Sequence, residues 1–160
     1  MLSTVVIIIS CYLVVVAFVF FNQRNLLYHP FENNYNQNEA NFSYDEVFIP
    51  TSNERYIKGW FHKKDLKKKK TLVFFHGNAG NLENRIYKLN LIKDFEINFL
   101  IVAYRGFSGN KGKPNEKGLY EDARSAVRWL NSKGIQDKNI ILYGESLGTA
   151  IAVEIAQNKK

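Results

Sequence analysis

The sequence has 160 residues and a net charge of +7, with 22 Lys and Arg against 15 Asp and Glu. This length is typical of a single domain. One cysteine, Cys11, excludes an internal disulfide and a zinc site built from cysteines. The basic residues form neither a basic helix nor an aromatic-basic array, so we expect no nucleic acid as a partner.

The first segment of the chain is apolar. Residues Thr4 to Phe21 carry no charge and are rich in Val, Ile and Phe. As a helix they would be about 27 Å long, close to the thickness of the hydrocarbon core of a bilayer. A cleaved signal peptide would need a basic start and a small-residue cleavage site, and the segment has neither. We therefore predict a single-pass membrane protein in which residues 1–22 form an uncleaved signal-anchor helix and residues 4–21 contact membrane lipid.

Residues 23–43 are predicted to be a linker, because the stretch Asn33 to Asn41 is rich in Asn and Gln and lacks a periodic apolar pattern. Residues 44–160 alternate between strand and helix patterns, which indicates an α/β fold with a mostly parallel sheet flanked by helices. Three of the strands are apolar runs typical of strands buried on both faces. In chain order the predicted elements are strands Tyr44–Ile49, Tyr56–Phe61 and Leu72–Phe75, helix Leu82–Asp94 with Asn81 as its N-cap, strand Asn98–Tyr104, helix Glu116–Lys133, strand Ile140–Tyr143 and helix Ser146–Asn158.

Much of the excess positive charge lies in one short run between the second and third predicted strands. The run consists of Lys63, Lys64 and Lys67 to Lys70. We predict a solvated loop here, and contact with anionic lipid headgroups is the alternative.

One serine lies where a strand pattern changes to a helix pattern. The stretch Gly144-Glu145-Ser146-Leu147-Gly148 matches Gly-x-Ser-x-Gly, and a helix rich in small residues follows it. A nucleophile on such a sharp turn has strained backbone and an exposed hydroxyl above the sheet. Gly144 and Gly148 are needed because a Cβ would clash where the strand and the helix approach each other. The pattern predicts Ser146 as a catalytic nucleophile; an ordinary glycine-rich turn with a serine helix cap is the alternative.

A second glycine-rich loop, His76-Gly77-Asn78-Ala79-Gly80, directly follows the first buried strand. Acyl transfer requires backbone N–H donors aimed at the oxyanion of the tetrahedral intermediate. One such donor is expected from Leu147, the residue after the nucleophile, and the other from Asn78 in this loop. His76 and Gly77 are predicted to shape the loop, and His76 is not predicted to be the base. This chemistry requires no cofactor and no metal.

These motifs together resemble the membrane-anchored α/β-hydrolases of the ABHD and bud-emergence type, from about Gln23 to Ala156. The resemblance implies the α/β-hydrolase fold and a serine hydrolase that cleaves an ester or a thioester. Some members act on lipids or acyl-proteins, and others carry peptidase-like labels. Ala103 stands where many relatives have Asp before the Tyr-Arg-Gly motif. The matching stretches are Phe75–Asn81, Tyr104–Gly109, Gly118–Ala123 and Gly144–Thr149.

The acid and the base of a catalytic triad are missing after Ser146. The fold places them in the order Ser, Asp or Glu, His. The 14 residues after Ser146 contain no Asp and no His, and His29, His62 and His76 all precede it. We therefore expect an N-terminal part of a hydrolase, truncated after the nucleophile helix. The alternative is a membrane-anchored pseudohydrolase or binding protein.

Truncation at this point would leave strand Ile140–Tyr143 at the edge of the sheet. An apolar, uncharged edge strand is unprotected against pairing with other strands. We expect the 160-residue chain by itself to be inactive and poorly stable.

Overall fold

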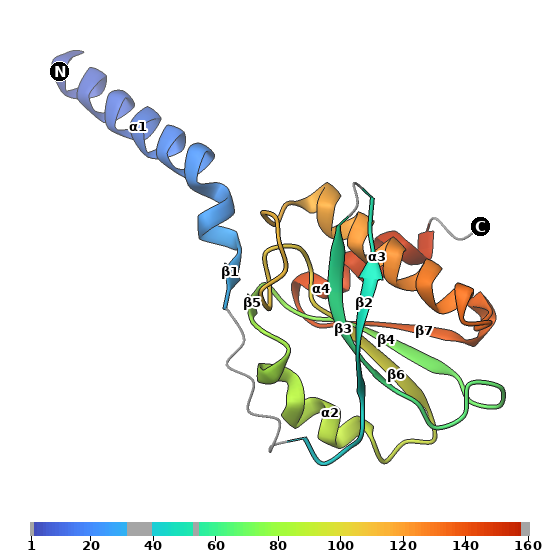
Figure 1. Cartoon of the computed structure of the whole chain (residues 1–160). Helices are drawn as coiled ribbons and strands as arrows, with labels where there is room; N and C mark the ends of the chain where they lie inside the picture. Colours follow the sequence, from blue (N-terminus) through green and yellow to red (C-terminus); the bar gives the residue numbers. More distant parts are fainter. Residues whose placement is uncertain (1, 32–39, 53–54, 158–160) are drawn as a thin grey trace.

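The computed structural model describes residues 2–31, 40–52 and 55–157. A long helix, α1 (Leu2–Leu27), precedes a domain in which a sheet lies between helices (Figure 1). The other elements are β1 (His29–Pro30), β2 (Asp45–Pro50), β3 (Tyr56–His62), β4 (Thr71–Phe75), β5 (Ala79–Gly80), the 3-10 helix η2 (Glu83–Arg85), α2 (Ile86–Ile92), β6 (Asn98–Val102), α3 (Glu116–Ser132), the 3-10 helix η3 (Asp137–Asn139), β7 (Ile140–Gly144) and α4 (Leu147–Gln157).

Five strands form the main sheet in the order β2-β3-β6-β4-β7. β4 pairs in parallel with both β6 and β7, and β3 pairs antiparallel with β2 and β6, so only β3 runs against the others. The sheet is therefore mostly parallel, as predicted. The carboxyl ends of β4, β6 and β7 meet at one edge, because Phe75 is the register partner of both Val102 and Gly144.

Helices cover both faces of the sheet. Figure 1 shows α2 on the opposite side of the sheet from α3 and α4, which lie next to each other. The two central strands are the most apolar ones: every residue of β6 is buried, and the Phe74 and Phe75 side chains of β4 are fully enclosed. The domain thus has one core, and its loops at the carboxyl edge are held by buried strands.

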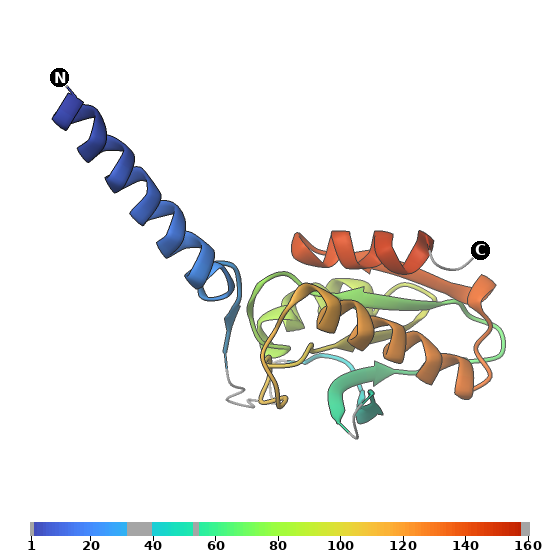
Figure 2. The same cartoon turned by 90° about the horizontal axis from the view of Figure 1, so that it is seen from above.

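Helix α1 is apolar up to Phe21, none of its residues is buried, and it projects away from the domain (Figure 2). Its mean hydropathy of 2.9 and its 26 residues suffice to cross a membrane, a criterion that an N-terminal signal sequence also meets. The helix continues beyond residue 22 to Leu27, and β1 follows at once. The linker predicted over 23–43 is therefore wrong in its first part, because residues 23–27 belong to α1 and residues 29–30 pair with β5; residues 32–39 lie outside the described residues.

The helix predicted over Leu82–Asp94 is divided into η2 and α2. The break occurs at Arg85, whose backbone (φ −105°, ψ −5°) departs from the α-helical conformation. Its guanidinium donates to the Ala79 carbonyl (2.8 Å) instead of pointing into solvent. Asn81 does cap the start of this segment, since its side chain accepts a hydrogen bond from the Asn84 N–H (3.0 Å).

Strand β7 is at the edge of the sheet, as the expected truncation predicts, but it is not buried on both faces. Among the described residues it pairs only with β4. Ile141 is 38% exposed and Tyr143 is 40% exposed. The prediction of a fully buried strand from the apolar run is wrong here, because one long side of β7 has no neighbouring strand among the described residues. The remaining predicted strands and helices differ from the structure only at their ends, and Asn158 lies outside the described residues.

The lysine loop joins β3 to β4 at the amino edge of the sheet, opposite the loops that follow β4 and β7. Its ammonium groups pair with acidic residues on the surface: Lys63 with Asp45, and Lys64 and Lys69 with Glu96 (3.5 and 2.7 Å). Exposed pairs of this kind contribute little to stability. The loop is therefore a surface feature at the far end of the sheet from Ser146.

Candidate functional site

Ser146 lies in the turn between β7 and α4, at the carboxyl edge of the sheet. It is exposed, and its φ of 51° is in the left-handed region that non-glycine residues seldom adopt. Such a conformation costs about 1–3 kcal/mol and persists only where the surrounding structure fixes it. Three backbone bonds do so: Glu145 N–H to Phe75 O (2.9 Å), Gly148 N–H to Glu145 O (2.8 Å) and Thr149 N–H to Ser146 O (2.9 Å).

The two glycines that flank this turn lie where α4 approaches the sheet. A Cβ added to Gly148 would lie against the carbonyl oxygen of Phe75, 2.6 Å from its carbonyl carbon and 2.9 Å from the His76 oxygen. A Cβ added to Gly144 would lie 2.5 Å from the Thr149 Cα. These contacts are with backbone that cannot move aside without separating the helix from the sheet. The spatial reason predicted for both glycines therefore agrees with the structure.

The loop of residues 76–80 lies directly beside this turn. A Cβ added to Gly77 would be 3.6 Å from the Ser146 Cβ and 3.5 Å from the Glu145 carbonyl oxygen. The structure thus brings together the two glycine-rich motifs that are 70 residues apart in the sequence.

Asn78 and Leu147 were predicted to supply two N–H donors. Within the part of the chain that the structure describes, neither backbone N–H donates a hydrogen bond to the protein. The other polar groups of Asn78 are engaged: its carbonyl accepts from the His29 N–H (2.8 Å), and its Nδ2 donates to Leu27 O (2.7 Å). The role of the two N–H groups as oxyanion donors therefore stays a prediction.

His76 is fully buried beneath the loop. Its Nδ1 lies 2.7 Å from the Gly77 carbonyl, and its ring packs against Tyr104 and Phe107 at centroid distances of 4.3 and 5.0 Å. The Tyr104 hydroxyl donates to the His76 carbonyl (3.0 Å). Burial lowers the pKa of the His76 imidazole to about 3. The His76 ring is therefore enclosed beneath the loop and neutral at physiological pH.

This burial has a consequence for acid stability. In the unfolded chain His76 titrates near its usual pKa of about 6.5, whereas in the folded chain its pKa is about 3. The unfolded state therefore binds the extra proton between these values. The free energy of unfolding is therefore unaffected by His76 above pH 6.5, and protonation of this ring in the unfolded chain lowers it progressively as the pH falls toward 3. Between pH 7.5 and pH 5 this amounts to about 2 kcal/mol.

We expect His76→Gln to reduce the pH dependence of the free energy of unfolding by about this 2 kcal/mol, measured by urea denaturation at the two pH values. The matched control is His29→Gln, because His29 is exposed. Equal pH dependence in the wild type and in His76→Gln would contradict the buried, neutral state of this ring.

Three charged residues next to the turn were not singled out from the sequence. The Glu145 carboxylate lies 3.2 Å from Arg85 Nε and 2.9 Å from Lys88 Nζ. The hydrogen bond to Glu145 raises the pKa of Lys88. Arg85 also donates to Ala79 O, so it connects the loop of residues 76–80 with the serine turn. The sequence holds one signal for this cluster of Arg85, Lys88 and Glu145, namely that Glu145 lies inside the Gly-x-Ser-x-Gly motif.

A second ion pair holds the loop after β6. Arg105 forms a two-pronged contact with the buried Asp122 carboxylate (Nη2 to Oδ1, 2.7 Å) and reaches Glu121 (2.7 Å). Burial raises the pKa of Asp122, and the hydrogen bonds from Arg105 oppose this shift. Gly118 leaves room for the guanidinium, since an added Cβ would be 2.7 Å from its Nε. The matching motifs Tyr104–Gly109 and Gly118–Ala123 therefore meet through this pair.

The two other histidines have contacts of their own. His62 stacks on Phe99 at 4.9 Å, and its Nδ1 lies 2.6 Å from Ser43 O. The His29 ring lies 3.1 Å from Leu26 O at the end of α1. The described residues contain no group of three or more His, Cys, Asp or Glu arranged to hold a metal ion.

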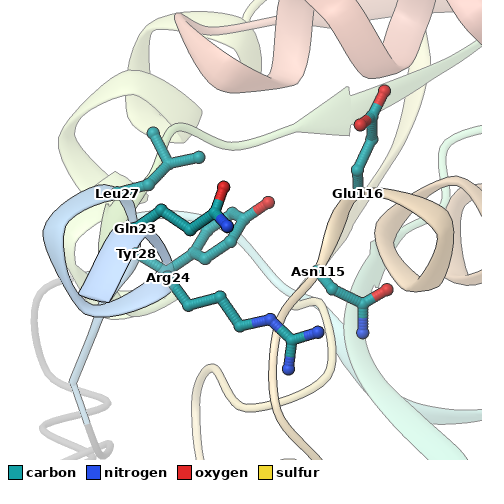
Figure 3. A pocket seen from close by; sticks show the side chains of 6 residues that line it. All are labelled: Gln23, Arg24, Leu27, Tyr28, Asn115 and Glu116. Carbon is teal, nitrogen blue, oxygen red and sulfur yellow. The ribbon is translucent and has the colours of Figure 1, made fainter. Parts of the chain in front are cut away.

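A cavity of about 270 Å³ separates the end of α1 from the start of α3. Figure 3 shows Arg24 and Tyr28 on one side of it and Asn115 and Glu116 on the other. Burial, with a contribution from Glu116, raises the pKa of Tyr28. Ser146 does not line this cavity, whose walls come from the end of α1, Tyr28 and the start of α3.

Comparison with known proteins places the chain in a family. The family described as "Chlamydia CHLPS protein (DUF818)" matches residues 20–160. The protein bem46 of Schizosaccharomyces pombe is 28% identical over 153 residues, covering 89% of this chain and 51% of the relative. The human alpha/beta hydrolase domain-containing protein 17B is 35% identical over 108 residues, covering 66% of this chain and 38% of that protein.

A solved structure of an α/β-hydrolase is also similar to this chain. The alpha-beta hydrolase of Vibrio vulnificus has a TM-score of 0.62 and 33% identity, covering 72% of this chain and 41% of that one. The chain thus spans about half or less of the length of these relatives. The chain belongs to the CHLPS (DUF818) family and is an α/β-hydrolase-fold protein of the ABHD and bud-emergence type.

Proposed function

We propose that the protein is a serine hydrolase that cleaves an ester or a thioester, with Ser146 as its nucleophile. The observation that carries this proposal is the exposed Ser146 in left-handed backbone, with Gly77 of the neighbouring loop against it. A strained strand-to-helix turn is how this fold exposes a nucleophile. Family membership and the hydrolase relatives support hydrolysis as the general activity.

In the proposed reaction Ser146 Oγ attacks the carbonyl carbon of the substrate. The unengaged N–H groups of Asn78 and Leu147 hold the resulting oxyanion. The start of α4 adds a favourable dipole for this negative charge. A histidine from residues beyond Lys160 would accept the serine proton and deliver it to the leaving group, and an acid would orient that histidine and stabilise its charged form. Lipids and acyl-proteins are the substrates that the family resemblance suggests.

A fluorophosphonate probe tests the nucleophile. The protein is expressed with its downstream reading frame, labelled in membranes, digested and analysed by mass spectrometry. We expect the label on the peptide containing Ser146 and its loss in Ser146→Ala, but not in Ser132→Ala, whose exposed hydroxyl lies at the end of α3. Labelling of a different residue would show that Ser146 is not the nucleophile, and no labelling at all would favour the pseudohydrolase.

We further propose that α1 anchors the protein in a membrane. The helix is apolar all round, and none of its residues is buried in the domain. The expected result is that the protein remains in the membrane fraction after carbonate extraction at alkaline pH, with residues 1–22 still attached. Release of a chain with an intact N-terminus would contradict the anchor, and a chain that begins after residue 22 would indicate a cleaved signal sequence.

A further inference from the structure

The segment that leaves α1 is bonded to the loop of residues 76–80. Strand β1 pairs in parallel with β5, with His29 opposite Ala79 and Pro30 opposite Gly80. The Phe31 N–H donates to the Gly80 carbonyl (3.1 Å). Residues about 50 positions apart in the sequence are therefore joined in the loop whose Gly77 lies beside Ser146.

Asn78 is held by this segment on two sides. Its carbonyl accepts from the His29 N–H, and its side chain donates to the Leu27 carbonyl at 2.7 Å. Leu27 is the last residue of α1, and carbonyls at a helix end have no partner within the helix. The Asn78 side chain therefore caps α1, while its backbone N–H stays unengaged.

Phe31 connects the same segment to a third loop. Its carbonyl accepts from the Ser108 N–H (3.3 Å), and the Ser108 hydroxyl accepts from the Leu82 N–H (3.0 Å). Ser108 is buried and, like Ser146, has a positive φ (53°). The segment thus lies between two loops of the carboxyl edge and bonds to both.

We propose that residues 27–31 are a positioning element of the oxyanion loop, so that the N-terminal helix belongs to the site and is more than a tether. This inference rests on the proposed function. The direction of the Asn78 N–H depends on the peptide units around it, and these are fixed by the bonds to Leu27 and His29. Misplacing a group by about 1 Å can cost on the order of 10²-fold in rate, and loss of one oxyanion donor costs about 10²–10³-fold.

The test uses the intact protein, with its downstream reading frame, in detergent micelles and a soluble short-chain p-nitrophenyl ester. A soluble substrate removes any dependence on presentation by a bilayer. Asn78→Ala removes the bond to Leu27 O but keeps the backbone N–H. Phe31→Pro removes the N–H that donates to Gly80 O, and Phe31→Ala is its matched control because it keeps that N–H. The Phe31 side chain is 60% exposed, so its loss alone should matter little.

We expect Asn78→Ala and Phe31→Pro each to lower kcat by about 10-fold or more with little change in KM, because the oxyanion forms only after the substrate is bound. Phe31→Ala keeps the N–H that donates to Gly80 O, so it should lower kcat less than Phe31→Pro does. The double variant Asn78→Ala with Phe31→Pro should lose less than the product of the two single losses, since both act through one loop.

The inference is overturned if Asn78→Ala and Phe31→Pro retain the kcat of Phe31→Ala, or if their defect lies in KM alone. Should Phe31→Pro unfold in a thermal melt, Asn78→Ala decides by itself, because it removes only a partly exposed side chain. Ser146→Ala separates the two proposals. If it remains active, the proposed function is wrong; if it is inactive while the loop variants behave as wild type, only the role of residues 27–31 is wrong.

Discussion

Replacing Ser146 with Ala is expected to lower kcat for ester hydrolysis by about 10⁶-fold, because the nucleophile of a serine hydrolase acts as a unit with its base. A residual acceleration of roughly 10³–10⁴ over water would remain from the oxyanion donors and from binding. The fold should be unaffected. Alanine and serine both carry a Cβ, so the cost of the left-handed backbone at residue 146 does not change. The hydrogen bond from the Thr149 N–H is to the carbonyl oxygen of residue 146 and does not involve the side chain.

The measurement is the initial rate of p-nitrophenyl ester hydrolysis by the purified intact protein, alongside its thermal unfolding. Ser132→Ala is the matched control, since its hydroxyl is exposed and donates to Trp129 O of its own helix. Full activity in Ser146→Ala would show that the nucleophile has been assigned to the wrong residue. Equal loss of activity and folding would contradict the expectation that the effect is chemical.

Gly148→Ala is expected to destabilise the domain by about 3 kcal/mol or more, since the new methyl group meets backbone instead of a flexible side chain. The methyl would lie against the Phe75 carbonyl and 2.9 Å from the His76 oxygen. Helix α4 would have to move away from β4, which would also shift the Leu147 N–H. Activity should therefore fall together with the free energy of unfolding, as measured by urea denaturation.

The control for this substitution is Gly109→Ala. Gly109 has a φ of 77°, but no atom lies within 4 Å of an added Cβ. Its alanine variant should lose only the cost of left-handed backbone, about 1–2 kcal/mol. If the two variants lose the same free energy of unfolding, the close approach of α4 to β4 is not what makes Gly148→Ala destabilising.

Local patterns were sufficient to predict most of the elements of this fold. The helix over Glu116–Ser132 was evident because its apolar residues recur with helical spacing, and the stripe that they form, which includes Leu119, Ala123 and Leu130, is buried. The strands β4 and β6 were evident because a run buried on both faces is apolar throughout. The contact of the two glycine-rich motifs followed from their places after parallel strands.

Features that depend on distant partners could not be read in this way. Nothing in the sequence around His29 and Pro30 resembles a strand, because two residues are too few to show a period. The break at Arg85 depends on a carbonyl and a carboxylate from other segments. The partial exposure of β7 depends on which strands lie beside it, and an apolar run looks the same at a centre and at an edge.

The edge at β7 makes the folding of this chain a competition between pairing within one molecule and pairing between molecules. Among the described residues one side of β7 has no partner strand, and neither charge nor proline protects Ile140–Tyr143. Another strand of suitable register can add to it, whether from a later segment or from a second copy. At high concentration or slow synthesis the second copy gains the advantage, and the expected product is edge-to-edge aggregation.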